Sequence, residues 1–106
     1  MTASNTNPLH GCWHLRSADA QLGLDEVVEM DFRPAGDLLY CIEAGPKWQV
    51  MRLKFRIEGS TIVTDQPSHP GEERTVFSFE PSGELVLDYG GLKAKFVKGA
   101  KRCPVV

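Results

Sequence analysis

Long apolar runs, a signal-peptide pattern and a charge of one dominant sign are all missing from this sequence. No stretch of the 106 residues approaches the roughly 18–20 apolar residues that a membrane-spanning helix needs. Residues 1–7 have neither the basic start nor the apolar core of a signal peptide. Twelve Lys and Arg against 14 Asp and Glu give a net charge of −2, without the basic excess that neutralises phosphates. We therefore expect binding to neither a membrane nor nucleic acid.

Cysteine is also scarce, because the chain has only Cys12, Cys41 and Cys103. An odd number of cysteines cannot all pair within one chain, and wide spacings do not make the framework of a disulfide-rich secreted domain. We expect free thiols in a reducing cytoplasm. A Cys12–Cys41 bridge is the alternative, if the protein is exported by a route without a recognisable signal.

Catalytic and cofactor motifs are missing as well. The Ser, His and Asp residues assemble no nucleophile, base and orienting group, and the Cys–His neighbours of the first strand have no orienting partner in view. We therefore expect a protein that is not an enzyme and carries no cofactor.

The sequence does contain strong alternation of apolar and polar residues. Side chains point to opposite faces along a strand, so alternation predicts half-buried antiparallel strands. The predicted strands cover residues 9–17, 26–33, 38–42, 49–58, 61–65, 74–80, 84–89 and 92–98. Residues 18–25 are expected to form a loop or one helical turn, and the polar stretch 66–73 is expected to be the longest loop.

A repeated segment predicts hairpins between these strands. Residues 32–39 (FRPAGDLL) match residues 79–86 (FEPSGELV) nearly position for position. In each copy a Phe ends a strand, a Pro fixes φ at the first corner, and a Gly supplies the left-handed residue after a type I turn. We expect the two copies to form the same hairpin.

Eight strands joined in sequence order form a meander, and closure into a barrel removes its exposed edges. A chain of 106 residues is long enough for one core. We predict an all-β fold, an antiparallel eight-stranded up-and-down barrel over residues 9–98 with little or no helix. Residues 1–8 are expected to be a flexible N-terminal tail and residues 99–106 a C-terminal tail.

The first strand carries Gly11-Cys12-Trp13, which resembles the Gly-x-Trp motif of the lipocalins in the calycin superfamily. Together with the eight-stranded meander, this makes residues 9–98 similar to the small bacterial lipocalin-like domains. The resemblance implies that Trp13 closes one end of the barrel. It also implies that Lys98, where the family more often has Arg, packs over the indole ring in a cation–π contact.

The inward faces of the predicted strands are rich in aromatic and Met side chains. The inward set is Trp13, Val28, Met30, Phe32, Tyr40, Ile42, Met51, Leu53, Phe55, Phe77, Phe79, Leu87, Tyr89 and Phe96. Such a set either lines a cavity for a small hydrophobic molecule or fills the barrel as a solid core.

For the cavity alternative, the tyrosine hydroxyls and Thr64 are expected to orient the ligand. The ligand-binding residues that we predict are Tyr40, Trp48, Met51, Phe55, Phe77 and Tyr89. Our leading hypothesis is a non-enzymatic lipocalin-like domain that takes a small hydrophobic ligand in the barrel mouth, near Trp48 and Tyr40.

A protein-interaction module is the alternative function. A small acidic chain with a solid barrel core and without a catalytic motif fits an inhibitor or an immunity-type protein, with residues 1–8 as the binding arm. The partner is then a protein, and the chain is a monomer or a homodimer.

His10, Cys12 and His14 occupy alternate positions of the first strand, so they share a face. Imidazole and thiolate groups suit zinc or copper. No acidic ligand is evident nearby, and we expect a solvated polar face without a metal.

Arg52, Lys54 and Arg56 form a basic stripe on the outward face of a central strand. Such a stripe can hold an acidic partner surface. We expect instead that it pairs across the strands with carboxylates such as Glu43 or Asp65.

Overall fold

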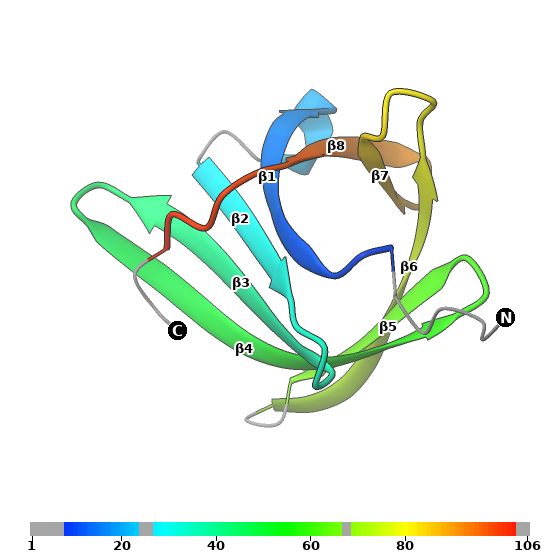
Figure 1. The fold of residues 1–106 in the computed structure, drawn as a ribbon, viewed down its shortest axis with the longest axis horizontal. Coiled ribbons are helices and arrows are strands. Elements are labelled where there is room, and N and C mark those ends of the chain that lie inside the picture. Colours follow the sequence, from blue (N-terminus) through cyan, green and yellow to red (C-terminus); the bar gives the residue numbers. More distant parts are fainter. Residues whose placement is uncertain (1–7, 24–26, 67–68, 104–106) are drawn as a thin grey trace, which may run out of the picture.

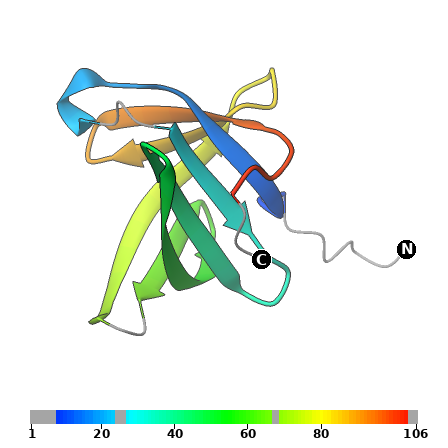
Figure 2. The same cartoon turned by 90° about the vertical axis from the view of Figure 1, so that its left-hand side faces the viewer.

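The computed structural model describes residues 8–23, 27–66 and 69–103, and these form one closed antiparallel barrel (Figure 1). The strands are β1 (Gly11–Ala18), β2 (Val27–Phe32), β3 (Asp37–Ala44), β4 (Lys47–Glu58), β5 (Thr61–Gln66), β6 (His69–Phe79), β7 (Leu85–Tyr89) and β8 (Leu92–Lys98). Each strand pairs with its neighbour in the sequence, and β1 pairs with β8 to close the sheet. Figure 2 shows this closing pair side by side, β1 in blue and β8 in orange. The predicted eight-stranded up-and-down barrel is confirmed.

Helical structure is minimal in the described part of the chain. A 3₁₀ turn, η1 (Ala20–Leu22), follows β1, as one alternative for residues 18–25 predicted, although residues 24–26 of that stretch lie outside the described residues. No helix of the described residues is long and apolar enough to cross a bilayer. The expected N-terminal tail, apart from Pro8, also lies outside the described residues.

The prediction that residues 66–73 form the longest loop is wrong for residue 66 and residues 69–73, which belong to strands. Residues 67 and 68 lie outside the described part of the chain. Strand β6 already begins at His69, and Glu72 and Glu73 pair with Asp65 and Thr64 of β5. One polar side chain of this segment, Glu72, points outward and forms an ion pair with Arg56 at 2.8 Å. Polarity alone therefore does not distinguish a loop from the outer face of a strand.

The two copies of the repeated segment form the same hairpin, as predicted. In the first, the Arg33 N–H donates to the Asp37 carbonyl at 2.8 Å, and Gly36 has φ +92°. In the second, the Glu80 N–H donates to the Glu84 carbonyl at 2.8 Å, and Gly83 has φ +93°. A side chain rarely adopts that φ, which explains the glycine in both copies.

The barrel interior holds the main core. Of the predicted inward set, Trp13, Val28, Met30, Phe32, Leu87 and Phe96 are buried, and Tyr40, Ile42, Leu53, Phe55 and Phe77 are half-buried against them. Met51, Phe79 and Tyr89 belong to the same faces but expose 37–40% of their surface, because they lie toward the ends of the barrel.

A second, smaller cluster lies on the outer side of the barrel. Leu39 and Cys41 of β3 are completely buried there against Cys103, with Trp48 and Val50 packed around them. Cys103 belongs to residues 99–103, which follow β8 and cross the outer side of β1 and β2 (Figure 1). Residues 99–103, predicted as the start of a tail, therefore pack on the barrel; residues 104–106 lie outside the described part.

Candidate functional site

Trp13 closes one end of the barrel. Its indole Nε1 donates a hydrogen bond to the Leu9 carbonyl at 3.0 Å, and its ring lies 5.9 Å from that of Phe79. The Lys98 ammonium sits 5.3 Å from the centre of the indole ring, as the Gly-x-Trp resemblance implied. A buried indole with its N–H satisfied and a cation over its face forms a rigid plug.

Gly11 lies against the Lys98 side chain of this plug. It has φ +118°, and a Cβ atom there would lie 2.7 Å from Cε of Lys98. Any side chain at this position would therefore displace the Lys98 stem from the indole ring. The positive φ and the path of Lys98 thus both favour glycine as the first letter of the Gly-x-Trp motif.

A cavity of about 400 Å³ occupies the other part of the barrel interior. It is lined by Met30, Phe32, Leu38, Tyr40, Ile42, Met51, Leu53, Ile62, Thr64, Glu73, Thr75, Leu87 and Tyr89. Most of these side chains are apolar, with two phenols, two threonine hydroxyls and one carboxylate among them. A mostly apolar wall with a few polar groups is the usual lining of a small-molecule site.

The cavity opens away from Trp13. Tyr89 is the last residue of β7 before the hairpin to β8, whereas Trp13 pairs with Lys98 at the opposite end of β8. A neighbouring hollow of about 470 Å³ shares Met51, Leu53, Thr64 and Glu73 with the cavity. The opening therefore lies at the ends of β4, β5 and β6 that are far from the plug.

The two tyrosines at this opening are neutral phenols at neutral pH. Burial, together with the nearby Tyr40 and Glu73, raises the pKa of Tyr89 to about 12. Burial also raises the pKa of Tyr40. Both hydroxyls can therefore donate as well as accept hydrogen bonds.

The cavity brings together half of the predicted ligand-binding residues. Tyr40, Met51 and Tyr89 line it. Phe55 does not, but packs edge-on against Phe32 of the cavity wall, with 5.1 Å between ring centres. Phe77 lies toward the plug, 5.9 Å from the Phe79 ring.

Trp48 is not at the barrel mouth as predicted. The inward residues of β4 have odd numbers, such as Met51 and Leu53 in the cavity wall, so Trp48 points outward and packs on the cluster of Leu39, Cys41 and Cys103. Alternation along β4 therefore predicts that Trp48 points outward. The prediction of Trp48 at the barrel mouth depended on its aromatic character instead.

Sequence reasoning also missed part of the cavity wall. Glu73 was assigned to a loop, yet it lies on β6 two residues before Thr75, and both line the cavity. Extending the alternation of Thr75 and Phe77 backwards along the chain would have placed Glu73 inward.

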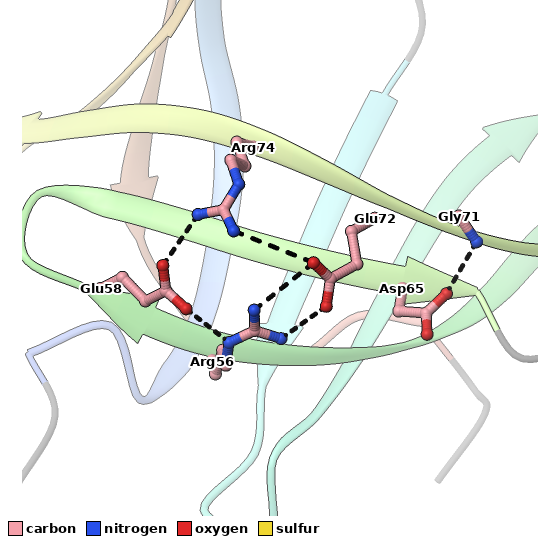
Figure 3. Close-up of polar contacts among 6 residues, drawn as sticks. All are labelled: Arg56, Glu58, Asp65, Gly71, Glu72 and Arg74. Carbon is pink, nitrogen blue, oxygen red and sulfur yellow. Dashed lines mark hydrogen bonds and ion pairs between the residues drawn. The ribbon is translucent and has the colours of Figure 1, made fainter.

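The basic stripe is paired, as predicted, but with other carboxylates. Lys54 bonds Asp37 at 2.8 Å. Arg56 contacts Glu58 at 2.7 Å and Glu72 at 2.8 Å, and Arg74 joins both carboxylates in a four-residue network (Figure 3). Hydrogen bonds from the two arginines lower the pKa of Glu58, and those from Arg56 lower the pKa of Glu72. The network is a solvated surface feature rather than a free anion site.

The face of His10, Cys12 and His14 is not the solvated face that the sequence analysis expected. Cys12 is 7% exposed, and residues 99–103 cover this side of β1 through the Gly99 N–H, which donates to the Cys12 carbonyl at 3.0 Å. An acidic group is also present, since Glu29 of β2 pairs with His14. All three cysteines are free and buried.

The chain was compared with protein-family models, with curated proteins and with solved structures, and none of the three comparisons found a match. What the protein does must therefore be inferred from its own geometry.

Proposed function

We propose that this protein is a non-enzymatic, lipocalin-like binding domain of the calycin type, which takes a small hydrophobic molecule through the open end of its barrel. The observation that carries the proposal is the cavity of about 400 Å³ with its largely apolar wall. Cavities of roughly 300–1,000 Å³ with such linings are typical of small-molecule sites. The plug of Trp13 and Lys98 at the other end supports the lipocalin-like assignment.

The polar groups at the opening restrict the ligand's chemistry. Tyr40, Tyr89 and Thr64 offer neutral hydroxyls, whereas Glu73 brings a carboxylate to the same rim. A ligand carboxylate placed there would be repelled by Glu73. We therefore expect a compact apolar molecule whose outer end is a neutral or cationic hydrogen-bonding group.

A cytoplasmic location is part of the same proposal. The three cysteines are free and buried, which fits a compartment that keeps thiols reduced.

The test is a matched pair of threonine substitutions on β5. Thr64→Phe places a ring in the cavity that Thr64 lines, whereas Thr61 lies an odd number of residues away on the opposite face of the strand. The probe is an apolar dye whose fluorescence rises on burial. We expect T64F to weaken dye binding by more than about tenfold, that is about 1.4 kcal/mol, and T61F to leave it unchanged.

Unfolding in urea checks that both variants remain folded, since filling a core site typically costs about 1–3 kcal/mol. Equal dye affinity in T64F and the unaltered protein would refute the cavity as the binding site. Failure of the unaltered protein to bind any apolar dye would favour the protein-interaction alternative instead.

A further inference from the structure

The outer side of β1, β2 and β3 gathers chemistry that ligand binding in the barrel does not use. Glu29 of β2 stands opposite His14 of β1 and Cys41 of β3 in the sheet. Cys12 of β1 and Cys103 after β8 approach it from either side. The three cysteines of the chain thus surround one carboxylate, although they are far apart in the sequence.

Glu29 is the unusual member of this group because it is completely buried. Its carboxylate accepts a hydrogen bond from the Arg102 N–H at 2.9 Å and from the Cys103 N–H at 3.2 Å. The Lys101 ammonium lies 3.9 Å away. A buried carboxylate is costly unless it is paired, and these three contacts supply partners to Glu29.

Three of these groups form a compact set of possible metal ligands. The thiol sulfur of Cys12, a ring nitrogen of His14 and a carboxylate oxygen of Glu29 all lie within 4.8 Å of one another. His14 Nδ1 is 3.7 Å from Glu29 Oε1. Ligand atoms on a tetrahedral zinc ion lie about 3.3–3.8 Å apart, given bond lengths near 2.0–2.3 Å. Only a small inward movement of the side chains is therefore needed.

The second nitrogen of His14 is held as it is in metal-bound histidines. Nε2 lies 2.7 Å from the Ala100 carbonyl, and a carbonyl only accepts, so Nε2 carries the hydrogen. Nδ1 then faces Glu29. A ligating histidine typically donates its other N–H to a backbone carbonyl, which fixes the ring. Gly99 leaves room for the ring in this position, because a Cβ atom there would lie 2.7 Å from Cδ2 of His14.

We propose that Cys12, His14 and Glu29 bind a divalent transition metal of the zinc class on the outer side of the barrel, beneath residues 99–103. The mixed sulfur, nitrogen and oxygen donors suit zinc better than calcium or magnesium, which prefer oxygen alone. Water takes the fourth position. On binding, the Cys12 thiol loses its proton to solvent and the thiolate bonds the metal.

A metal ion can reach the site from solvent, because His14 borders a groove of about 610 Å³ that is also lined by Gly99, Ala100 and Arg102.

The neighbouring pair, Cys41 and Cys103, offers a rival set with Glu29. Their two sulfur atoms lie within 4.8 Å of each other, and Cys41 is completely buried. Among the described residues, no histidine belongs to that set. We therefore assign the metal to the Cys12 side.

The test is a cobalt titration of the full chain after removal of bound metal with a chelator. Cobalt stands in for zinc and gives a thiolate-to-metal absorption band in the near ultraviolet. We expect one equivalent to bind, the band to vanish in Cys12→Ser, and cobalt affinity to fall by more than about tenfold in His14→Gln. His10→Gln, on the same side of the chain but outside the set, should leave the titration unchanged.

Three outcomes would overturn the assignment. The first is the absence of stoichiometric cobalt binding by the unaltered protein. The second is a band that survives in Cys12→Ser but is lost in Cys103→Ser, which would place the metal on the rival set. The third is equal weakening by His10→Gln and His14→Gln. Circular dichroism of each variant shows whether it is folded, and the serine and glutamine replacements keep the size of the side chains.

Discussion

Gly11 and Lys98 show how a single residue positions the closed end of the barrel. The cation over the Trp13 ring requires the Lys98 stem to pass where a Cβ atom of residue 11 would lie. The resemblance to a Gly-x-Trp motif predicted the contact between Trp13 and Lys98 from the sequence. The reason for the glycine, in contrast, emerges only from the packing.

We expect Gly11→Ala to lower the free energy of unfolding by about 1–3 kcal/mol, because it adds backbone strain at φ +118° and a collision with Lys98. Gly91→Ala is the matched control, since Gly91 has a similar φ, +101°, but no atom within 4 Å of the added carbon. Urea unfolding measures both.

A double-mutant cycle measures how much of this cost comes from the collision with Lys98. In a Lys98→Ala background, the cost of Gly11→Ala should shrink toward that of Gly91→Ala. Equal losses for the two glycine variants in the unaltered background would show that Lys98 is not what excludes a side chain at residue 11.

At the scale of strands, alternation predicted the order, pairing and inward faces well, because the period of two is a direct consequence of strand geometry. Strand ends were predicted less well. β6 begins at His69, inside a stretch whose polarity was interpreted as a loop. Its polar side chains, such as Glu72, are stabilised by partners on β4, and those partners are not visible until the strands are aligned.

The network of Arg56, Glu58, Glu72 and Arg74 therefore supports the extension of β6 (Figure 3). The pKa of Glu58 and that of Glu72 are below the ordinary value of 4.5. A carboxyl whose folded pKa is lowered stabilises the fold above its unfolded pKa, and this contribution is lost as the pH falls through the folded pKa. Stability should thus decrease from about pH 4.5 downward.

We expect Glu72→Gln to make the loss of stability at acid pH shallower and to lower the urea midpoint at pH 7. The difference in midpoint from the unaltered protein should shrink in high salt, because the ion pair is exposed. Asp88→Asn is the control, since Asp88 lies outside the network and accepts a hydrogen bond from the Gly91 N–H. A midpoint difference that salt does not reduce would mean that the ion pairs are not its cause.

At the scale of the whole molecule, the sequence predicted the barrel, but it did not predict how the interior is filled or that residues 99–103 pack on the outer side. The inward set was compatible with both a cavity and a solid core. Alternation shows on which side of a strand a side chain lies, but not how much of the barrel interior the side chains fill. Alternation places Glu29 and Cys41 on the outer side of the barrel, but it does not predict that residues 99–103 bury them there. A segment without alternation carries no signal of where it docks.

We expect removal of residues 99–106 to expose Cys41 and to make it react with a water-soluble thiol reagent, because Cys103 and the neighbouring backbone no longer cover it. Removal of residues 104–106 alone is the control and should leave Cys41 protected. Mass spectrometry of labelled peptides measures both. Protection of Cys41 in the longer truncation would show that other residues suffice to bury it.

The measurement that tests the central proposal most directly is a native mass spectrum of the unaltered protein and of Thr64→Phe, each purified from cells without added ligand. A small organic molecule bound to the unaltered protein and missing from the variant is the result we predict, with any metal ion retained by both. Identical bare masses, in protein that also binds no apolar dye, would contradict ligand binding in the barrel.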